Sequence, residues 1–204
     1  SGMPGRAFSA LALLKWEAVR HTEYAVLFLS DIDVDFFFPF AGRLPRNSSR
    51  QWRILEHGWT RALDSFMASP DVQLVGSSDF ATPINTGVLL LKPNAQTYAL
   101  GVEALRTKRW DVARGFNFSG APRDVLALAN VPARTAGYFN GSHMLRANHW
   151  ATTGGDADQG LFAYVFLGLQ RARSFRMAGS RTNGTRPAAV FVNHFWGGTK
   201  PWLR

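Results

Sequence analysis

The stretch VLFLSDIDVDFFF, residues 26–38, limits the possible fold more than any other part of this sequence. The apolar residues from Val26 to Leu29 predict a buried strand, and Asp31, Asp33 and Asp35 follow it at alternate positions. Carboxylates two residues apart on an extended chain lie on one face, roughly 6 to 7 Å apart. Each neighbouring pair repels by roughly 2 to 3 kcal/mol at an effective dielectric near 20. The pattern therefore predicts a strand whose carboxyl end holds a positive group between the aspartates.

Helical and strand-like segments alternate along the rest of the chain. Apolar spacing predicts helices over 8–21, 51–67, 94–107 and 158–172, and strands over 24–30, 72–76, 84–93 and 188–195. This alternation predicts an α/β fold with a mostly parallel sheet. Residues 115–155 lack a lasting period and predict a working loop region or an insertion. With 204 residues and 46% hydrophobic residues, we expect a single domain over 1–204.

Composition narrows the class of protein. The net charge of +9 comes almost wholly from scattered arginines, which favours phosphate-bearing ligands, and no stretch resembles a nucleic-acid-binding module. The sequence has no cysteine and no apolar run long enough to span a membrane, and we expect no signal peptide at its start. Four of the nine asparagines (Asn47, Asn117, Asn140 and Asn183) occupy N-x-Ser/Thr sequons, which predicts either a glycosylated chain of the secretory pathway or a chance excess.

The aspartates after the strand have several interpretations. The carboxyl end of a strand is where open α/β sheets bind ligands. A calcium-binding helix-loop-helix site is excluded, because Phe36 and Gly42 occupy the turn-glycine and bidentate-acid positions. A haloacid-dehalogenase-type phosphatase, with GGDADQG as its later acidic motif, remains open, and so do surface carboxylates without a role.

The segment VNHFWGGTKPW near the end of the sequence predicts a diphosphate site. Its two glycines let backbone N–H groups approach an anion, and the Lys200 ammonium can neutralise phosphate. His194 can complete a metal site with Asp31 and Asp33. Two carboxylates and one imidazole suit Mn²⁺ better than Mg²⁺ or Ca²⁺, with Mg²⁺ as the alternative ion.

Four motifs, taken together and in order, resemble those of glycosyltransferase family 8, the retaining nucleotide-sugar transferases that include glycogenin and galactinol synthase. LLKWEAVRHTEYAVLFLSDID resembles the lysine helix and D-x-D strand of that family, and PINTGVLLLKPN resembles its F-N-[ST]-G-V strand. DADQGLF is similar to its D-Q-G-L-[LF] segment, and HFWGGTKPW is similar to its H-F-x-G-x-x-K-P-W ending. Ile84 replaces the usual phenylalanine, Ser30 precedes the D-x-D, and Asp156 is shifted by one from the family's acidic position, which Gly155 occupies.

The resemblance implies a role for each matching residue. A Mn²⁺ ion would bind Asp31, Asp33 and His194 and bridge the diphosphate of a UDP-sugar. Lys15, Asp79, Asn85, Gly87, Gly197 and Lys200 would bind this donor. Asp158 and Gln159 would lie beside the anomeric carbon as the catalytic pair.

The resemblance also implies a GT-A-type, Rossmann-like domain that moves a hexose to an acceptor hydroxyl with retention. Because the chain begins at the lysine helix, we expect it to lack the amino-terminal strand-helix-strand unit that binds the nucleotide. Expected partners are the UDP-sugar, a glycan, polyol or protein acceptor and a second copy in a homodimer, with membrane attachment only through an anchor outside this chain. The Golgi lumen is the expected location and the cytoplasm the alternative. A non-catalytic glycan-binding relative is the competing interpretation.

Overall fold

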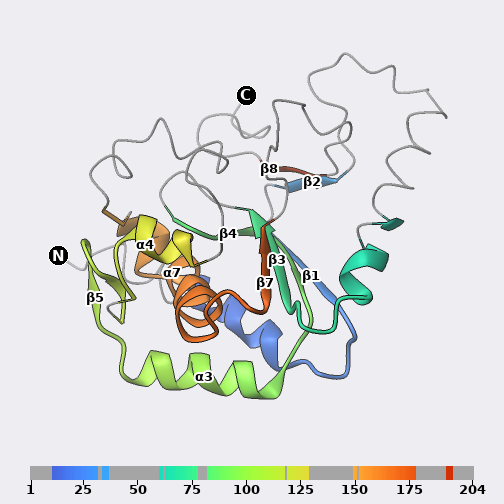
Figure 1. Ribbon diagram of the computed structural model, residues 1–204, viewed down its shortest axis with the longest axis horizontal. Helices are drawn as coiled ribbons and strands as arrows, with labels where there is room; N and C mark the ends of the chain where they lie inside the picture. The colour runs from blue at the N-terminus through green and yellow to red at the C-terminus, as the bar shows by residue number, and fades with distance from the viewer. Residues whose placement is uncertain are drawn as a thin grey trace, which may run out of the picture.

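A computed structural model describes residues 11–31, 34–36, 60–61, 63–77, 82–117, 119–128, 149–150, 152–177 and 192–194. The strands in these ranges are β1 (Leu27–Ser30), β2 (Val34–Phe36), β3 (Leu74–Ser77), β4 (Asn85–Leu91), β5 (Trp110–Asp111), β6 (Gly115–Phe116), β7 (Phe175–Met177) and β8 (Val192–His194). The helices include η1 (Leu14–Arg20), α3 (Ala95–Arg106), α4 (Pro122–Ala127), α6 (Thr152–Gly155), α7 (Asp158–Phe162) and η3 (Ala163–Leu169), and residues 11–13, 60–61 and 63–67 are helical as well. The described chain thus mixes helices with small sheets (Figure 1).

The central sheet of the described residues is mostly antiparallel. Its strand order is β1-β4-β3-β7, and β4 runs antiparallel to both of its neighbours. The pairing of β3 with β7 is parallel. The expectation of a mostly parallel sheet is therefore wrong for these strands. The physical reason is the short connection between β3 and β4, since parallel neighbours need a crossover of a dozen or more residues.

The direction of β4 determines which strand ends meet. Ser30 at the end of β1 pairs with Val88 near the start of β4, and the Asp31 N–H donates to the Gly87 carbonyl at 2.9 Å. The carboxyl end of β1 therefore lies beside the amino end of β4. Two of the motifs predicted to bind a ligand become neighbours by this antiparallel pairing.

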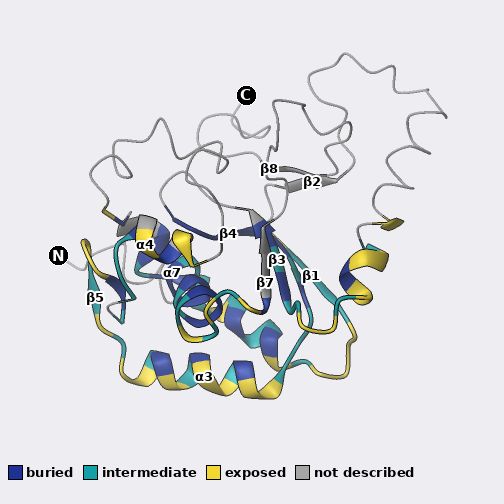
Figure 2. Ribbon diagram, viewed as in Figure 1, coloured by how far each residue is buried: buried dark blue, intermediate teal, exposed yellow. Residues whose placement is uncertain are grey.

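Helices pack against the sheet and against each other around an aromatic core. In Figure 1, α3 lies along one side of the molecule, and η1 and the α7–η3 helix lie between it and the strands. Trp16 of η1 is buried and packs edge-on against Phe162, with ring centroids 4.9 Å apart. Gly101 of α3 makes room for Trp16, because a Cβ there would lie 2.0 Å from the indole. Figure 2 shows the buried stripe of α3 turned toward this core and its exposed stripe turned outward.

The local patterns predicted several elements correctly. The strand expected over 84–93 is β4, and the helix expected over 94–107 is α3, whose N-cap Asn94 accepts a hydrogen bond from the Thr97 N–H at 2.9 Å. The buried helix expected over 158–172 is α7 continued by the π-helix η3. The irregular region expected over 115–155 does contain short elements, namely β6, α4 and α6.

Candidate functional site

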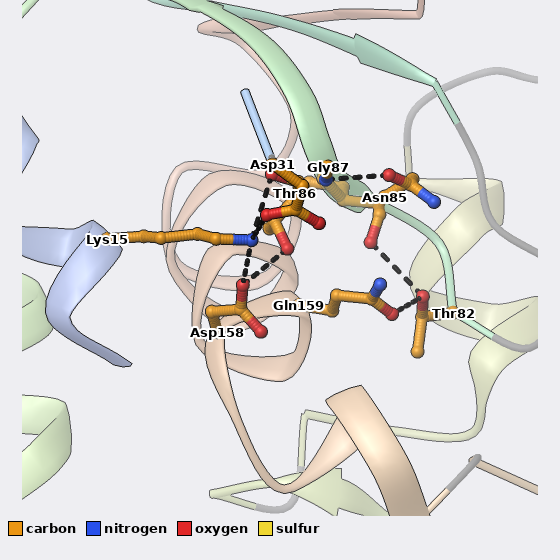
Figure 3. Close-up of polar contacts among 9 residues, drawn as sticks. Lys15, Asp31, Thr82, Asn85, Thr86, Gly87, Asp158 and Gln159 are labelled. Carbon is orange, nitrogen blue, oxygen red and sulfur yellow. Dashed lines mark hydrogen bonds and ion pairs between the residues drawn. The ribbon is translucent and has the colours of Figure 1, made fainter. Parts of the chain in front are cut away.

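The Lys15 side chain joins three of the predicted motifs. Its Nζ lies 2.6 Å from Asp31 Oδ1 and 3.0 Å from Asp158 Oδ2 (Figure 3). Lys15 belongs to η1, Asp31 follows β1, and Asp158 begins α7. The ammonium also donates to the Thr86 carbonyl at 3.3 Å. The prediction of a positive group between the alternating aspartates is not tested here, because the side chains of Asp33 and Asp35 lie outside those that the structure describes; the ammonium lies instead between Asp31 and the distant Asp158.

Burial and charge act on Lys15 in opposite directions. Desolvation by itself lowers the pKa of Lys15. The negative charges of Asp158 and Asp31, together with the hydrogen bond to Asp31, outweigh this effect, so the pKa of Lys15 is raised above its ordinary value. Asp158 is 5% exposed, and the Thr86 hydroxyl donates to its Oδ2 at 2.5 Å. The buried carboxylate therefore receives one ion pair and one hydroxyl hydrogen bond, which orient the same oxygen.

The amino end of β4 carries Asn85 and Gly87 and lies beside Asp31. The Asn85 Oδ1 accepts a hydrogen bond from the Gly87 N–H at 2.7 Å and so shapes the backbone between them. Thr86, whose hydroxyl binds Asp158, lies between these two predicted donor-binding residues. Alternation along a strand explains the difference in role, because neighbouring side chains point to opposite faces.

Gln159 lies against a second threonine. The Thr82 hydroxyl makes a short contact with the Gln159 side-chain amide and lies 3.1 Å from the Ile84 carbonyl oxygen (Figure 3). Gly154 is also close to this amide, because a Cβ at Gly154 would lie 2.7 Å from Gln159 Oε1. Sequence reasoning missed Thr82 and Thr86. The only signal that could have indicated them is their position, because Thr82 precedes the motif segment PINTG and Thr86 lies within it.

Lys108 was also missed, and it binds the acidic residue that the sequence places one position off the family pattern. Its Nζ lies 2.8 Å from Asp156 Oδ1 and donates to the Asp156 backbone carbonyl at 2.6 Å. This pair attaches the segment that leads into α7 to the turn after α3. No local pattern could have found it, because the two residues are 48 positions apart.

The remaining predicted positions lie outside the residues whose side chains the structure describes. Asp33, Asp79, Gly197 and Lys200 belong to this group, and only the backbone of His194 is described. That backbone is informative, because β2 and β8 pair antiparallel with His194 opposite Val34. The pairing brings the predicted histidine ligand level with the strand that follows the D-x-D aspartates. Within the described residues, no group of three or more metal-ligating side chains occurs.

The sequon at Asn117 has a structural use. Asn117 lies at φ 47°, its Nδ2 donates to the Ala104 carbonyl at 2.9 Å, and its Oδ1 accepts from the Arg109 N–H at 2.7 Å. Both ends of the amide that would carry a glycan are thus bound within the fold. Of the other sequons, Asn47, Asn140 and Asn183 lie outside the described residues.

Among the helices that the structure describes, none is long and apolar enough to cross a membrane.

Comparisons with known proteins give no assignment. No protein-family model, no curated protein and no solved structure matches this chain.

Proposed function

We propose that the chain is a retaining glycosyltransferase domain that moves a hexose from a UDP-sugar to an acceptor hydroxyl. The observation that carries the proposal is the contact of Lys15 with Asp31, Asp158 and the Thr86 carbonyl, because these residues come from three of the four motifs that resemble glycosyltransferase family 8. Asp31 and Asp158 lie 16 and 143 positions after Lys15 in the sequence, so their contacts with Lys15 depend on the fold of the chain. The proposal includes a GT-A-type domain and a glycan, polyol or protein acceptor.

The charges suit the transfer reaction. Breaking the anomeric bond builds negative charge on the departing UDP oxygen and positive charge on the sugar ring. Lys15 would stabilise the first charge, and the buried carboxylate of Asp158 would stabilise the second. The departing phosphate can accept the acceptor's proton, so the reaction needs no strong side-chain base. Thr86 holds Asp158 in place for this role.

A divalent metal, Mn²⁺ or Mg²⁺, fits the residues proposed to bind it. Asp31 supplies a carboxylate at the site, and the pairing of β2 with β8 brings His194 to the strand that follows Asp33. Hard carboxylate oxygens with one imidazole are a donor set suited to Mn²⁺. Such an ion would neutralise the diphosphate when bound. Gly197 and Lys200 would bind the same diphosphate, and Asp79, Asn85 and Gly87 the rest of the donor.

Calorimetric titration of UDP with and without Mn²⁺ tests the proposal. We expect micromolar binding that disappears with EDTA and is weakened at least tenfold by Asp31→Asn. Glu103→Gln on the exposed side of α3 is the matched control, because it also removes one carboxylate charge and should leave binding unchanged. Circular dichroism of each variant shows that it is folded.

The alternatives predict other results. A non-catalytic glycan-binding relative would show no Mn²⁺-dependent UDP binding. A phosphatase would hydrolyse a phosphomonoester with Mg²⁺ and form an aspartyl-phosphate at Asp31. Absence of UDP binding by the folded chain contradicts the proposal, and hydrolysis or transfer from a panel of UDP-sugars would support it.

A further inference from the structure

The Lys108 ammonium binds one residue, Asp156, at two places. Its Nζ lies 2.8 Å from Asp156 Oδ1 and donates to the backbone carbonyl of the same residue at 2.6 Å. The Nζ also lies 5.5 Å from the centroid of the Phe116 ring, which is within the range at which an aromatic face attracts a cation. These contacts, which we call the Lys108 clamp, fix the backbone at Asp156 as well as its side chain.

The peptide unit between Asp156 and Ala157 is bound at both of its polar atoms. Its carbonyl oxygen accepts from Lys108, and its N–H, which belongs to Ala157, donates to the Gly154 carbonyl at 3.0 Å. A peptide unit is planar, so it cannot rotate without moving both atoms. Ala157 is also completely buried, so rotation would disturb a packed residue. The orientation of this peptide unit is therefore fixed as long as Lys108 holds it.

The helix α7 begins directly after this peptide unit. The Ala157 carbonyl accepts a hydrogen bond from the Leu161 N–H at 3.0 Å, and Asp158 is the first residue of α7. The Asp158 carboxylate belongs to the candidate site and is two positions from the residue that Lys108 binds. The Lys108 clamp thus sets the point and the direction from which α7 starts.

The residues before the clamp give this start little stiffness of their own. Gly154 and Gly155 precede Asp156, and Gly154 has a φ of +93°, which residues with side chains rarely adopt. Glycine has more backbone conformations available than any other residue. A paired glycine segment does not by itself determine where the next helix points, so the restraint has to come from a contact such as the one with Lys108.

We propose that Lys108 is a positioning residue for Asp158. By fixing the start of α7, Lys108 holds the Asp158 carboxylate beside the Lys15 ammonium, 3.0 Å away. Each acid of the segment DAD then has its own lysine, because Lys108 binds Asp156 and Lys15 binds Asp158. The effect on sugar transfer rests on the proposed function, whereas the fixing of α7 does not.

Amide hydrogen exchange of the full chain, followed residue by residue by NMR, tests the positioning directly. The Leu161 N–H reports on the first turn of α7, and the Gln170 N–H, which donates to the Val165 carbonyl at 2.9 Å, reports on the far end of the same continuous helix. We expect Lys108→Met to accelerate exchange at Leu161 relative to Gln170 by roughly tenfold or more, because the released end opens locally. A general loss of stability would accelerate both amides alike.

Lys92→Met is the matched control. It also removes an ammonium that lies over a phenylalanine ring, Phe66, and donates to a backbone carbonyl, that of Ser69. This variant should leave the ratio of the two exchange rates unchanged. Lys108→Arg keeps the charge and several N–H donors, so it should keep the Leu161 amide protected.

Asp156→Asn separates the two contacts of the clamp. It removes the ion pair but leaves the backbone carbonyl for Lys108 to bind, so its exchange ratio should lie between those of wild type and Lys108→Met. An exchange ratio in Lys108→Met equal to that of wild type would contradict the proposal. If Lys108→Met does not fold, Asp156→Asn decides, because an unchanged ratio in that variant would also contradict it.

Kinetics separates this proposal from the proposed function. If the chain transfers sugar, we expect Lys108→Met to lower kcat roughly tenfold or more with KM within about twofold, because a displaced group affects the reacting geometry more than binding. Lys108→Arg should restore most of the kcat. A raised KM with unchanged kcat would indicate a contribution to binding instead and would contradict the positioning role. If neither wild type nor any variant turns over a UDP-sugar, the proposed function fails, and the exchange rates still decide whether Lys108 fixes α7.

Discussion

At the scale of single residues, one ammonium group balances two carboxylates. The Lys15 side chain is 25% exposed and the Asp158 side chain 7%, so this ion pair is more shielded from water than those on the outer helix faces. Removing one member of a shielded pair leaves the other as an uncompensated charge. The structure therefore makes Lys15 important for stability as well as for the proposed chemistry.

Lys15→Met should lower the free energy of unfolding by about 2 to 3 kcal/mol, somewhat less than for a fully buried pair because Lys15 is partly exposed. Urea denaturation followed by circular dichroism measures the change. Arg106→Met is the matched control, because Arg106 and Glu103 are both well exposed and their pair contributes at most about 0.5 kcal/mol. Equal losses in the two variants would contradict the role assigned to the Lys15 cluster.

The same cluster predicts a dependence of stability on pH. The pKa of Lys15 is raised above its ordinary value of 10.5 by Asp158 and Asp31, which outweigh the opposing effect of burial. A raised pKa means that the folded state binds the proton more tightly than the unfolded state does. The contribution of Lys15 to folding stability is therefore complete below pH 10.5 and is lost as the pH rises through the folded-state pKa of Lys15.

Urea titrations between pH 9 and pH 12 should show this loss. Subtracting the stability of Lys15→Met from that of wild type removes the contribution of the other titrating groups. We expect the difference to be constant up to about pH 10 and to shrink above it. A difference that does not change with pH in this range would show that Lys15 titrates alike in both states.

At the scale of elements, glycine decides how α6 and α7 pack. A Cβ at Gly160 of α7 would lie 1.8 Å from the Gly155 carbonyl oxygen, which is backbone and cannot move aside cheaply. A Cβ at Gly168 of η3 would have nothing closer than the Tyr164 ring at 3.8 Å. The same substitution should thus have opposite effects within one continuous helix.

Gly160→Ala should lower the stability by about 3 kcal/mol or more, because overpacking against backbone forces the elements apart. Gly168→Ala should be neutral or raise the stability by up to about 1 kcal/mol, because alanine loses less conformational freedom in a helix than glycine does. Thermal unfolding should show the first variant melting roughly 6 to 12 °C lower than the second. Similar melting temperatures would contradict the close contact between Gly160 and Gly155.

At the scale of the whole molecule, two tryptophans differ in the hydrogen bonding of their indole N–H groups. Trp16 joins η1, α3 and α7, and its Nε1 donates to the Tyr98 carbonyl at 3.1 Å. The buried Trp110 Nε1 has no hydrogen-bond partner among the residues that the structure describes. Replacing either tryptophan by phenylalanine removes a similar side-chain volume, but only the replacement of Trp16 removes a hydrogen bond that the structure describes.

Trp16→Phe should lower the free energy of unfolding by about 2 to 3 kcal/mol, because it opens the core and leaves the Tyr98 carbonyl without this donor. Trp110→Phe should cost about 1 kcal/mol or less, because losing an unpaired N–H offsets part of the lost packing. Chemical denaturation of both variants gives the comparison. A larger loss in Trp110→Phe would show that its indole N–H is paired in solution.

The sequence by itself determined the local elements and part of the candidate site. The periods of 84–93 and 94–107 predicted β4 and α3 with its Asn94 cap, since side-chain spacing and capping act within a few residues. The motif resemblance selected Lys15, Asp31 and Asp158, which the fold brings into contact.

Only the tertiary structure decided how these pieces meet. The antiparallel direction of β4, the hydroxyls of Thr82 and Thr86, and the pair of Lys108 with Asp156 depend on contacts between distant segments. Hydrophobic period reports which face of an element is buried, but not which partner covers it or in which direction that partner runs. The partners follow from how the whole chain closes around its core, which no local pattern contains.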